Sequence, residues 1–119
     1  METSRLPVYN AARELYLQIV RSTQKCPVNL RRGRIAELEE GVLKIMDGIA
    51  FANDSQDVRG RLAFIAEAQA KMRSIEVEMR CIFDLGFLRK RSFAAIIRCE
   101  DKVTRQLAGW EKRTLSDAR

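Results

Sequence analysis

The segment 35–52 carries an apolar stripe that constrains the fold more than any other stretch of the chain. Its apolar residues recur at steps of three and four, at Ile35, Leu38, Val42, Ile45, Ile49 and Ala52. This spacing places the side chains on one side of an α-helix. One amphipathic helix cannot bury its own apolar side, so the rest of the chain must provide helices that pack against it.

Three further segments show helical periodicity with recognisable ends. Pro7 suits the first position of a helix, because its missing N–H would have no partner there, and Pro27 ends that helix. Gly86 ends the third segment, because glycine readily adopts the left-handed conformation of a helix C-terminus. We expect helices at residues 7–25, 30–52, 56–85 and 89–112, with residues 113–119 as a frayed tail.

Polar and small residues refine this expectation. Asn29 is the expected N-cap of helix 30–52, and Asn53 with Gln56 resembles a capping box before the third helix. Gly41 and Gly48 lie seven residues apart in helix 30–52. We interpret this pair either as a close approach by a neighbouring helix or as a chance spacing.

The four segments predict a single all-α domain covering residues 1–119. A chain of 119 residues suits one compact domain. Long amphipathic helices joined by short connections are typical of an antiparallel up-down-up-down four-helix bundle. No segment shows the alternation of apolar and polar residues that predicts a β-strand.

Composition favours a binding protein over an enzyme. The net charge is +6, from 22 basic and 16 acidic residues, which favours an anionic partner, with nucleic acid ahead of a membrane. The sequence has no histidine, which excludes the Glu-x-x-His motif of ferritin-like di-iron bundles. It also has no Walker loop and no nucleophile–base pair. We expect no enzymatic activity, no metal and no cofactor.

The cysteines and the apolar runs predict a cytoplasmic protein. Cys26, Cys81 and Cys99 lie far apart without a CxxC pair, so we expect reduced thiols that serve as small core residues. No apolar run approaches the roughly 18 residues of a membrane span. The first ten residues lack the apolar centre of a signal peptide.

The expected topology gathers positive charge at one end. In such a bundle, the connection between the first two helices lies beside the connection between the last two. Seven cations flank these connections: Lys25, Arg31, Arg32, Arg34, Arg89, Lys90 and Arg91. Six of them lie at helix N-termini, where the helix dipole is positive and free N–H groups can bind phosphate. We predict phosphate contacts to nucleic acid without base reading; the alternative is loop charge that serves solubility.

Two other features point to contacts with further subunits. Several apolar residues lie off the stripes, and we predict an oligomer interface made by Tyr9, Tyr16, Leu17, Val20 and Ile97. The alternative is that these residues pack the edges of the bundle. Glu100 is the single carboxylate on the stripe of helix 89–112, and we expect it to reach an arginine or a neighbouring subunit.

Several stretches, in their order and spacing, resemble a known superfamily. They are LPVYNAARELYLQIVRSTQKCP, RRGR, IMDGIAFAN, DLGFL and LAGW. The sequence between about residues 6 and 110 resembles the four-helix-bundle superfamily of ribosomal RNA intervening-sequence proteins and the accessory variability determinant of diversity-generating retroelements. The resemblance implies a homopentamer with a basic nucleic-acid-binding surface. For the accessory determinants it also implies a reverse transcriptase partner and RNA. The segment KIMDGIAFAND departs from the intervening-sequence pattern, which favours the accessory-determinant branch.

Two hypotheses follow from the sequence. The first is a non-enzymatic oligomeric bundle that binds RNA through its basic end, as an accessory to a reverse transcriptase or as an intervening-sequence protein. The second is a protein-interaction scaffold whose oligomeric ring docks a protein partner, with the charge serving solubility.

Overall fold

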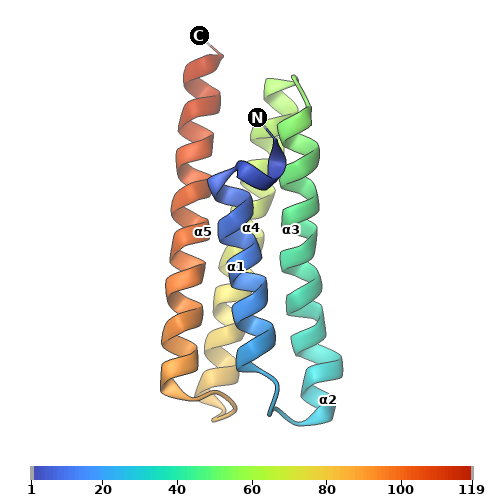
Figure 1. Cartoon of the computed structure of the whole chain (residues 1–119), viewed down its shortest axis with the longest axis vertical. Coiled ribbons are helices and arrows are strands. Elements are labelled where there is room, and N and C mark those ends of the chain that lie inside the picture. The colour runs from blue at the N-terminus through green and yellow to red at the C-terminus, as the bar shows by residue number, and fades with distance from the viewer. Residues whose placement is uncertain (1, 119) are drawn as a thin grey trace.

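The protein, described here by a computed structural model for residues 2–118, consists of helices without strands in that range (Figure 1). Helix α1 spans Pro7–Ser22, α4 spans Val58–Asp84 and α5 spans Lys90–Asp117. The second long helix is continuous but has three parts. These are α2 (Val28–Leu30), the π-helical segment η2 (Arg31–Ile35) and α3 (Ala36–Asp54). A 3₁₀ turn, η1 (Thr3–Arg5), precedes α1.

The four long helices lie side by side in an elongated molecule of 49 × 22 × 22 Å. Helix α1 packs against α3 and α5, and α4 packs against the same two helices. Figure 1 shows the connection from α1 to α2 at the same end as the connection from α4 to α5. The connection from α3 to α4 lies at the other end. The predicted all-α architecture of four helices is therefore confirmed.

The core follows the apolar stripe predicted in 35–52. All six of its residues are buried. The neighbouring helices supply fully buried partners, among them Leu15 and Ile19 from α1, Met72 and Met79 from α4, and Ile96 and Leu107 from α5. Because burying one such side chain stabilises a fold by about 1.5–3 kcal/mol, this shared core is the main stabilising feature of the bundle.

Two helix ends differ from the prediction, and near each of them a threonine hydroxyl bonds to the backbone one turn earlier. Helix α1 ends at Ser22 instead of Lys25, where the Thr23 hydroxyl donates to the Ile19 carbonyl at 2.7 Å. Helix α5 continues to Asp117, past the predicted end at 112 and through most of the segment expected to be frayed. Within that extension, Thr114 is buried and its hydroxyl donates to the Trp110 carbonyl at 2.8 Å. Residue 119 lies outside the described residues.

Both predicted N-terminal caps are wrong, whereas the predicted C-terminal glycine is confirmed. The second helix begins at Val28, so Asn29 lies inside its first turn. Helix α4 is capped by the Asp57 carboxylate, which accepts from the Arg59 N–H at 3.1 Å. Gly86 has a φ of 88°. Its N–H and that of the next residue bond back to the last turn of α4, as in a Schellman motif.

The two glycines of α3 differ in what approaches them. A β carbon at Gly48 would overlap the ring of Phe64, so the predicted close approach of a neighbouring helix is found there. At Gly41 the nearest atom, Ile75 Cδ1, would be 3.7 Å away, which is an ordinary contact. The Phe64 ring meets Trp110 edge-on, with ring centroids 6.3 Å apart. Gly48 thus makes room for an aromatic contact between α4 and α5.

Candidate nucleic-acid interface

The connections that precede α2 and α5 touch at one end of the bundle. The Cys26 thiol donates to the Phe87 carbonyl oxygen at 3.4 Å. Burial raises the pKa of the Cys26 thiol, while the charge of Arg31 acts in the opposite direction. A raised pKa keeps the thiol protonated and able to donate. This contact ties together two connections that are 61 residues apart in sequence.

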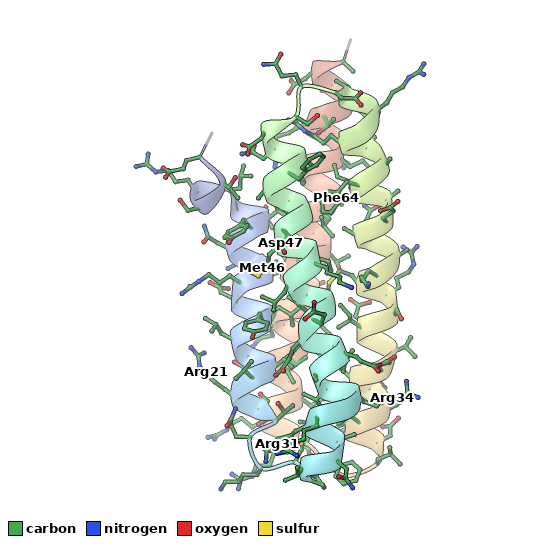
Figure 2. All side chains as sticks on the ribbon, turned by 90° about the vertical axis from the view of Figure 1, so that its right-hand side faces the viewer. Arg21, Arg31, Arg34, Met46, Asp47 and Phe64 are labelled. Atoms are coloured by element: carbon green, nitrogen blue, oxygen red, sulfur yellow. The ribbon has the colours of Figure 1, made fainter. Side chains whose placement is uncertain are left out.

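The seven predicted cations form the basic end, and all of them are exposed. Lys25 lies in the turn after α1. Three arginines lie in η2, and Arg89, Lys90 and Arg91 form the N-terminal cap and first turn of α5. Figure 2 shows Arg31 and Arg34 near one end of the molecule, well away from Phe64. The structure therefore brings these seven residues to the end predicted for them.

Two of these arginines are restrained by neighbours. Arg31 Nε donates to the Cys26 carbonyl at 3.0 Å, which fixes the start of its side chain beside the contact between the two connections. Arg34 lies 3.8 Å from the Glu78 carboxylate in a largely exposed ion pair, and such pairs contribute at most about 1 kcal/mol. Among residues 2–118, no ion pair offsets the charge of the other six cations.

Three arginines of the basic end lie in an unusual helical turn. Residues 31–35 are π-helical, a rare geometry that is common at functional sites. Ile35 is buried in the core, whereas Arg31, Arg32, Gly33 and Arg34 are exposed. The widened turn is thus anchored at one residue, and it presents three cations to solvent within four positions.

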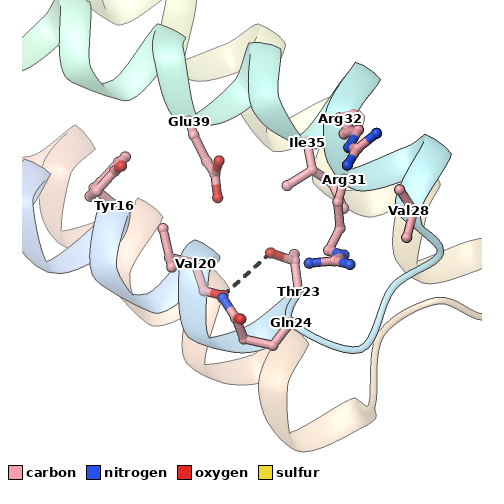
Figure 3. Close-up of a pocket in the computed structure, with 9 residues that line it drawn as sticks. All are labelled: Tyr16, Val20, Thr23, Gln24, Val28, Arg31, Arg32, Ile35 and Glu39. Carbon is pink, nitrogen blue, oxygen red and sulfur yellow. Dashed lines mark hydrogen bonds between the residues drawn. The ribbon is translucent and has the colours of Figure 1, made fainter.

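A pocket of about 410 Å³ opens between α1 and α3 beside these arginines (Figure 3). Its lining comes from Tyr16, Val20, Thr23, Gln24, Val28, Arg31, Arg32, Ile35 and Glu39. The volume falls within the range of small-ligand sites. Burial raises the pKa of Glu39 on the α3 side. Two predicted phosphate-binding residues therefore share one pocket with Tyr16 and Val20, which were predicted to mediate oligomerisation.

A second pocket, the loop pocket, lies between the two connections and has a volume of about 210 Å³. Its lining includes three cations, two hydroxyls and an aromatic ring, from Arg21, Lys25, Arg89, Ser22, Ser92 and Phe87. Phe87 is 41% exposed. Cations neutralise phosphates and exposed rings stack on unpaired bases. The loop pocket therefore brings groups that can contact phosphates next to an aromatic side chain that can stack on an unpaired base.

Sequence reasoning missed Arg21 and Phe87 in this pocket. Arg21 lies four residues before Lys25, so both occur on one side of the helix that the sequence predicted to run to 25. This four-residue spacing is the sequence signal that could have identified Arg21 as a member of the pocket. No sequence signal indicated that Phe87 would be exposed, because its exposure depends on how the Schellman motif directs the chain.

The five residues predicted for an oligomer interface do not form one patch. Tyr9 and Tyr16 are half-buried and pack against the core. Val20 lies with Tyr16 in the α1–α3 pocket, and Leu17 is half-buried on α1. Ile97 instead lines a pocket between α4 and α5. Because α4 contacts α3 and α5 but not α1, this pocket is on a different side of the bundle.

Within residues 2–118, none of the helices has the length and apolar character needed to span a lipid bilayer. No protein family model matches the sequence, and a comparison with curated proteins finds no match. The superfamily resemblance therefore stays a prediction.

Proposed function

We propose that the protein is an oligomeric RNA-binding bundle, without enzymatic activity, that contacts RNA phosphates through its basic end. The alternating up-down-up-down direction of the helices is part of this proposal. It is supported by the short connections and by the contact between Cys26 and Phe87 at one end. The observation that carries the function is the loop pocket, which is lined by exposed cations and an exposed phenylalanine.

The loop pocket favours RNA with unpaired bases over duplex nucleic acid. Stacking on Phe87 requires a base that has left its helix, and such bases are typical of RNA loops and bulges. Arg21, Lys25 and Arg89 would neutralise the neighbouring phosphates. The remaining cations of the basic end would extend the contact along the backbone without reading sequence.

The test of the phosphate contacts is the salt dependence of RNA affinity. A structured RNA with single-stranded loops is titrated between about 50 and 200 mM salt, where the slope of log affinity against log salt counts the neutralised phosphates. The test variant replaces Arg31, Arg32, Arg34, Arg89, Lys90 and Arg91 by glutamine. We expect its slope to flatten by up to about four, because each contact with a single strand contributes about 0.7.

A control variant loses the same charge elsewhere on the surface. It replaces six exposed cations outside the basic end by glutamine: Arg13, Arg59, Arg73, Arg98, Lys112 and Arg113. We expect this control to keep most of the salt dependence. Equal slopes in the two variants would mean that net charge alone drives the binding, and the basic end would lose its assigned role.

The aromatic contact has its own test. Phe87→Ala should weaken binding of a loop-containing RNA by about fivefold or more, since stacking contributes about 1–3 kcal/mol per base, while the salt slope stays unchanged. Phe51→Ala is the matched control, because Phe51 is also exposed but lies near the end of α3, away from the basic end. Equal effects of the two substitutions on RNA affinity would show that Phe87 is not part of the RNA-binding site.

The oligomer and its partner are proposals that depend on the resemblance. We propose a cytoplasmic homopentamer, and an accessory role to a reverse transcriptase. Light scattering at micromolar concentration measures the assembly directly, and a monomer mass would refute it. Co-purification with a reverse transcriptase encoded nearby would support the accessory role.

The second candidate function is a protein-interaction scaffold. It is favoured by large exposed apolar side chains outside the basic end, of which Phe51 and Val77 are 81% and 64% exposed. Such side chains can anchor a protein partner. This reading predicts no RNA binding at physiological salt, together with a partner that is recovered by pull-down and lost in the Phe51→Ala variant.

A further inference from the structure

A separate pocket of about 300 Å³ lies between α4 and α5. Glu76 and Arg80 line it from α4, and the lining from α5 consists of Phe93, Ile97, Glu100, Asp101 and Thr104. Glu100 is ten residues beyond Lys90, or about 15 Å further along the helix. The α4–α5 pocket is therefore distinct from the loop pocket, and its chemistry is acidic where that of the loop pocket is basic.

Glu100 is the unusual residue of this pocket. Its side chain is buried, with 4% exposed, and its Oε2 atom has no hydrogen-bond partner among residues 2–118. Of the two partners expected from the sequence, an arginine or a neighbouring subunit, the arginine is not found among residues 2–118. A buried polar atom without a partner destabilises a protein, so such atoms are rare and need an explanation.

The charged groups around Glu100 leave its carboxylate unbalanced. Glu76 lies on the facing helix, where its Oε1 accepts from the Thr104 hydroxyl at 3.3 Å. Burial, and secondarily the charge of Glu76, raises the pKa of Glu100 to about 7. The nearby cation, Arg80, pairs with Asp84 at 3.3 Å and lies over the Phe93 ring at 5.9 Å. Asp101 also lines the pocket but pairs with Arg105 at 3.0 Å. Glu76 and Glu100 are thus the two carboxylates of the pocket without a cationic partner among residues 2–118, and the arginine of the pocket is engaged elsewhere.

The apolar lining limits what can balance these carboxylates. Phe93 is buried and stacked on Phe83, whereas Ile97 is 43% exposed at the pocket. A ligand that fits this lining has a cationic head for the carboxylates and a short alkyl stem for the apolar side chains. Alkylguanidinium and alkylammonium groups have this form, and long cationic side chains bury their stems in the same way.

We propose that the α4–α5 pocket binds an alkylguanidinium or alkylammonium group, with its charged head on Glu100 and Glu76 and its stem against Phe93 and Ile97. The proposal does not depend on RNA binding. The cation comes either from a free small amine or from a lysine or arginine of a second copy of this chain, which has 22 such residues. A charge-assisted contact would satisfy the unpartnered oxygen of Glu100.

The direct test is calorimetric titration of the full chain with n-butylguanidinium at pH 8, with n-butylurea as the uncharged ligand control. We expect Glu100→Gln to weaken binding at least tenfold and Glu76→Gln to weaken it less. The matched control Glu67→Gln, an exposed carboxylate on the same helix as Glu76, should bind as the wild type does. Equal binding of the urea, or equal affinities of the wild type and Glu100→Gln, would overturn the proposal.

A spectroscopic readout keeps the test independent of any folding defect. With ¹³C-labelled glutamate carboxyls, n-butylguanidinium should lower the apparent pKa of Glu100, because a bound cation favours the charged form. An unchanged titration at saturating ligand would refute the contact. Circular dichroism of each variant confirms that its helices are intact.

Sedimentation then identifies the source of the cation. If the wild type self-associates, and both Glu100→Gln and added n-butylguanidinium dissociate it, the group comes from a second copy. If the ligand binds while the sedimenting mass stays constant, the pocket serves a free small cation.

Discussion

Glu100→Gln should make the bundle more stable at alkaline pH and leave its stability almost unchanged at acidic pH. Burial, with a smaller contribution from Glu76, raises the pKa of Glu100 from 4.5 to about 7. The folded protein therefore holds the Glu100 proton more tightly than the unfolded chain does. The wild type has its full stability below pH 4.5, loses part of it as the pH rises toward 7, and levels off above that.

The magnitude follows from the two pKa values. At about 1.36 kcal/mol per pH unit, the difference between 4.5 and about 7 corresponds to roughly 3 kcal/mol. Water that reaches the α4–α5 pocket screens the charge, so we expect about 1–3 kcal/mol. Glutamine has nearly the same shape and no charge, so the variant avoids this loss. At pH 8 its melting temperature should rise by roughly 4–12 °C.

The assay is urea unfolding of the wild type and Glu100→Gln at pH 5 and pH 8, at one protein concentration. At each pH, the free energy of unfolding of the wild type is subtracted from that of Glu100→Gln. The change in this difference between pH 5 and pH 8 tests the prediction, because effects common to both proteins cancel. Glu67→Gln provides the baseline for loss of an exposed carboxylate. A stability difference that is the same at pH 5 and pH 8, within about 0.5 kcal/mol, would refute the reasoning.

Two further predictions concern packing and thiol reactivity. Gly48→Ala should destabilise the fold by about 1–3 kcal/mol in urea unfolding, because its β carbon would overlap the Phe64 ring. Gly41→Ala should instead stabilise it by up to about 1 kcal/mol, since alanine favours a helix and meets only ordinary contacts; equal effects at both sites would contradict the packing. Exposed Cys81 should react with a disulfide reagent at least about tenfold faster than Cys26, which is buried and has a raised pKa; comparable rates, followed by mass spectrometry, would show that Cys26 is accessible.

The core was predictable because it depends on periodicity, whereas the helix ends depend on single hydrogen bonds. The apolar spacing in 35–52 identified six residues that are all buried. The sequence did not show that the hydroxyls of Thr23 and Thr114 would bond to carbonyls of the preceding turn, or that Asp57 would cap α4. Several nearby polar residues compete for such positions, and tertiary packing decides among them.

The candidate sites show the same division. The basic end was predictable from the order of helices and the lengths of their connections, because these place its charges without regard to side-chain detail. The pockets could not be predicted, because each depends on side chains from helices far apart in sequence. Glu76 and Glu100 share a pocket although 24 positions separate them, and the spacing along α5 alone shows only that Glu100 interrupts an apolar stripe.

The elongated shape of the molecule has a practical consequence for studying it. The principal extent is 49 Å, and the basic end and the connection from α3 to α4 occupy opposite ends of that length (Figure 1). A fluorophore attached at Asp54, which is exposed, would therefore sit nearly a full molecular length from the expected RNA contact. Energy transfer from that dye to one on the RNA would distinguish end-on binding from binding along the side of the helices, with the contacting residues left unmodified.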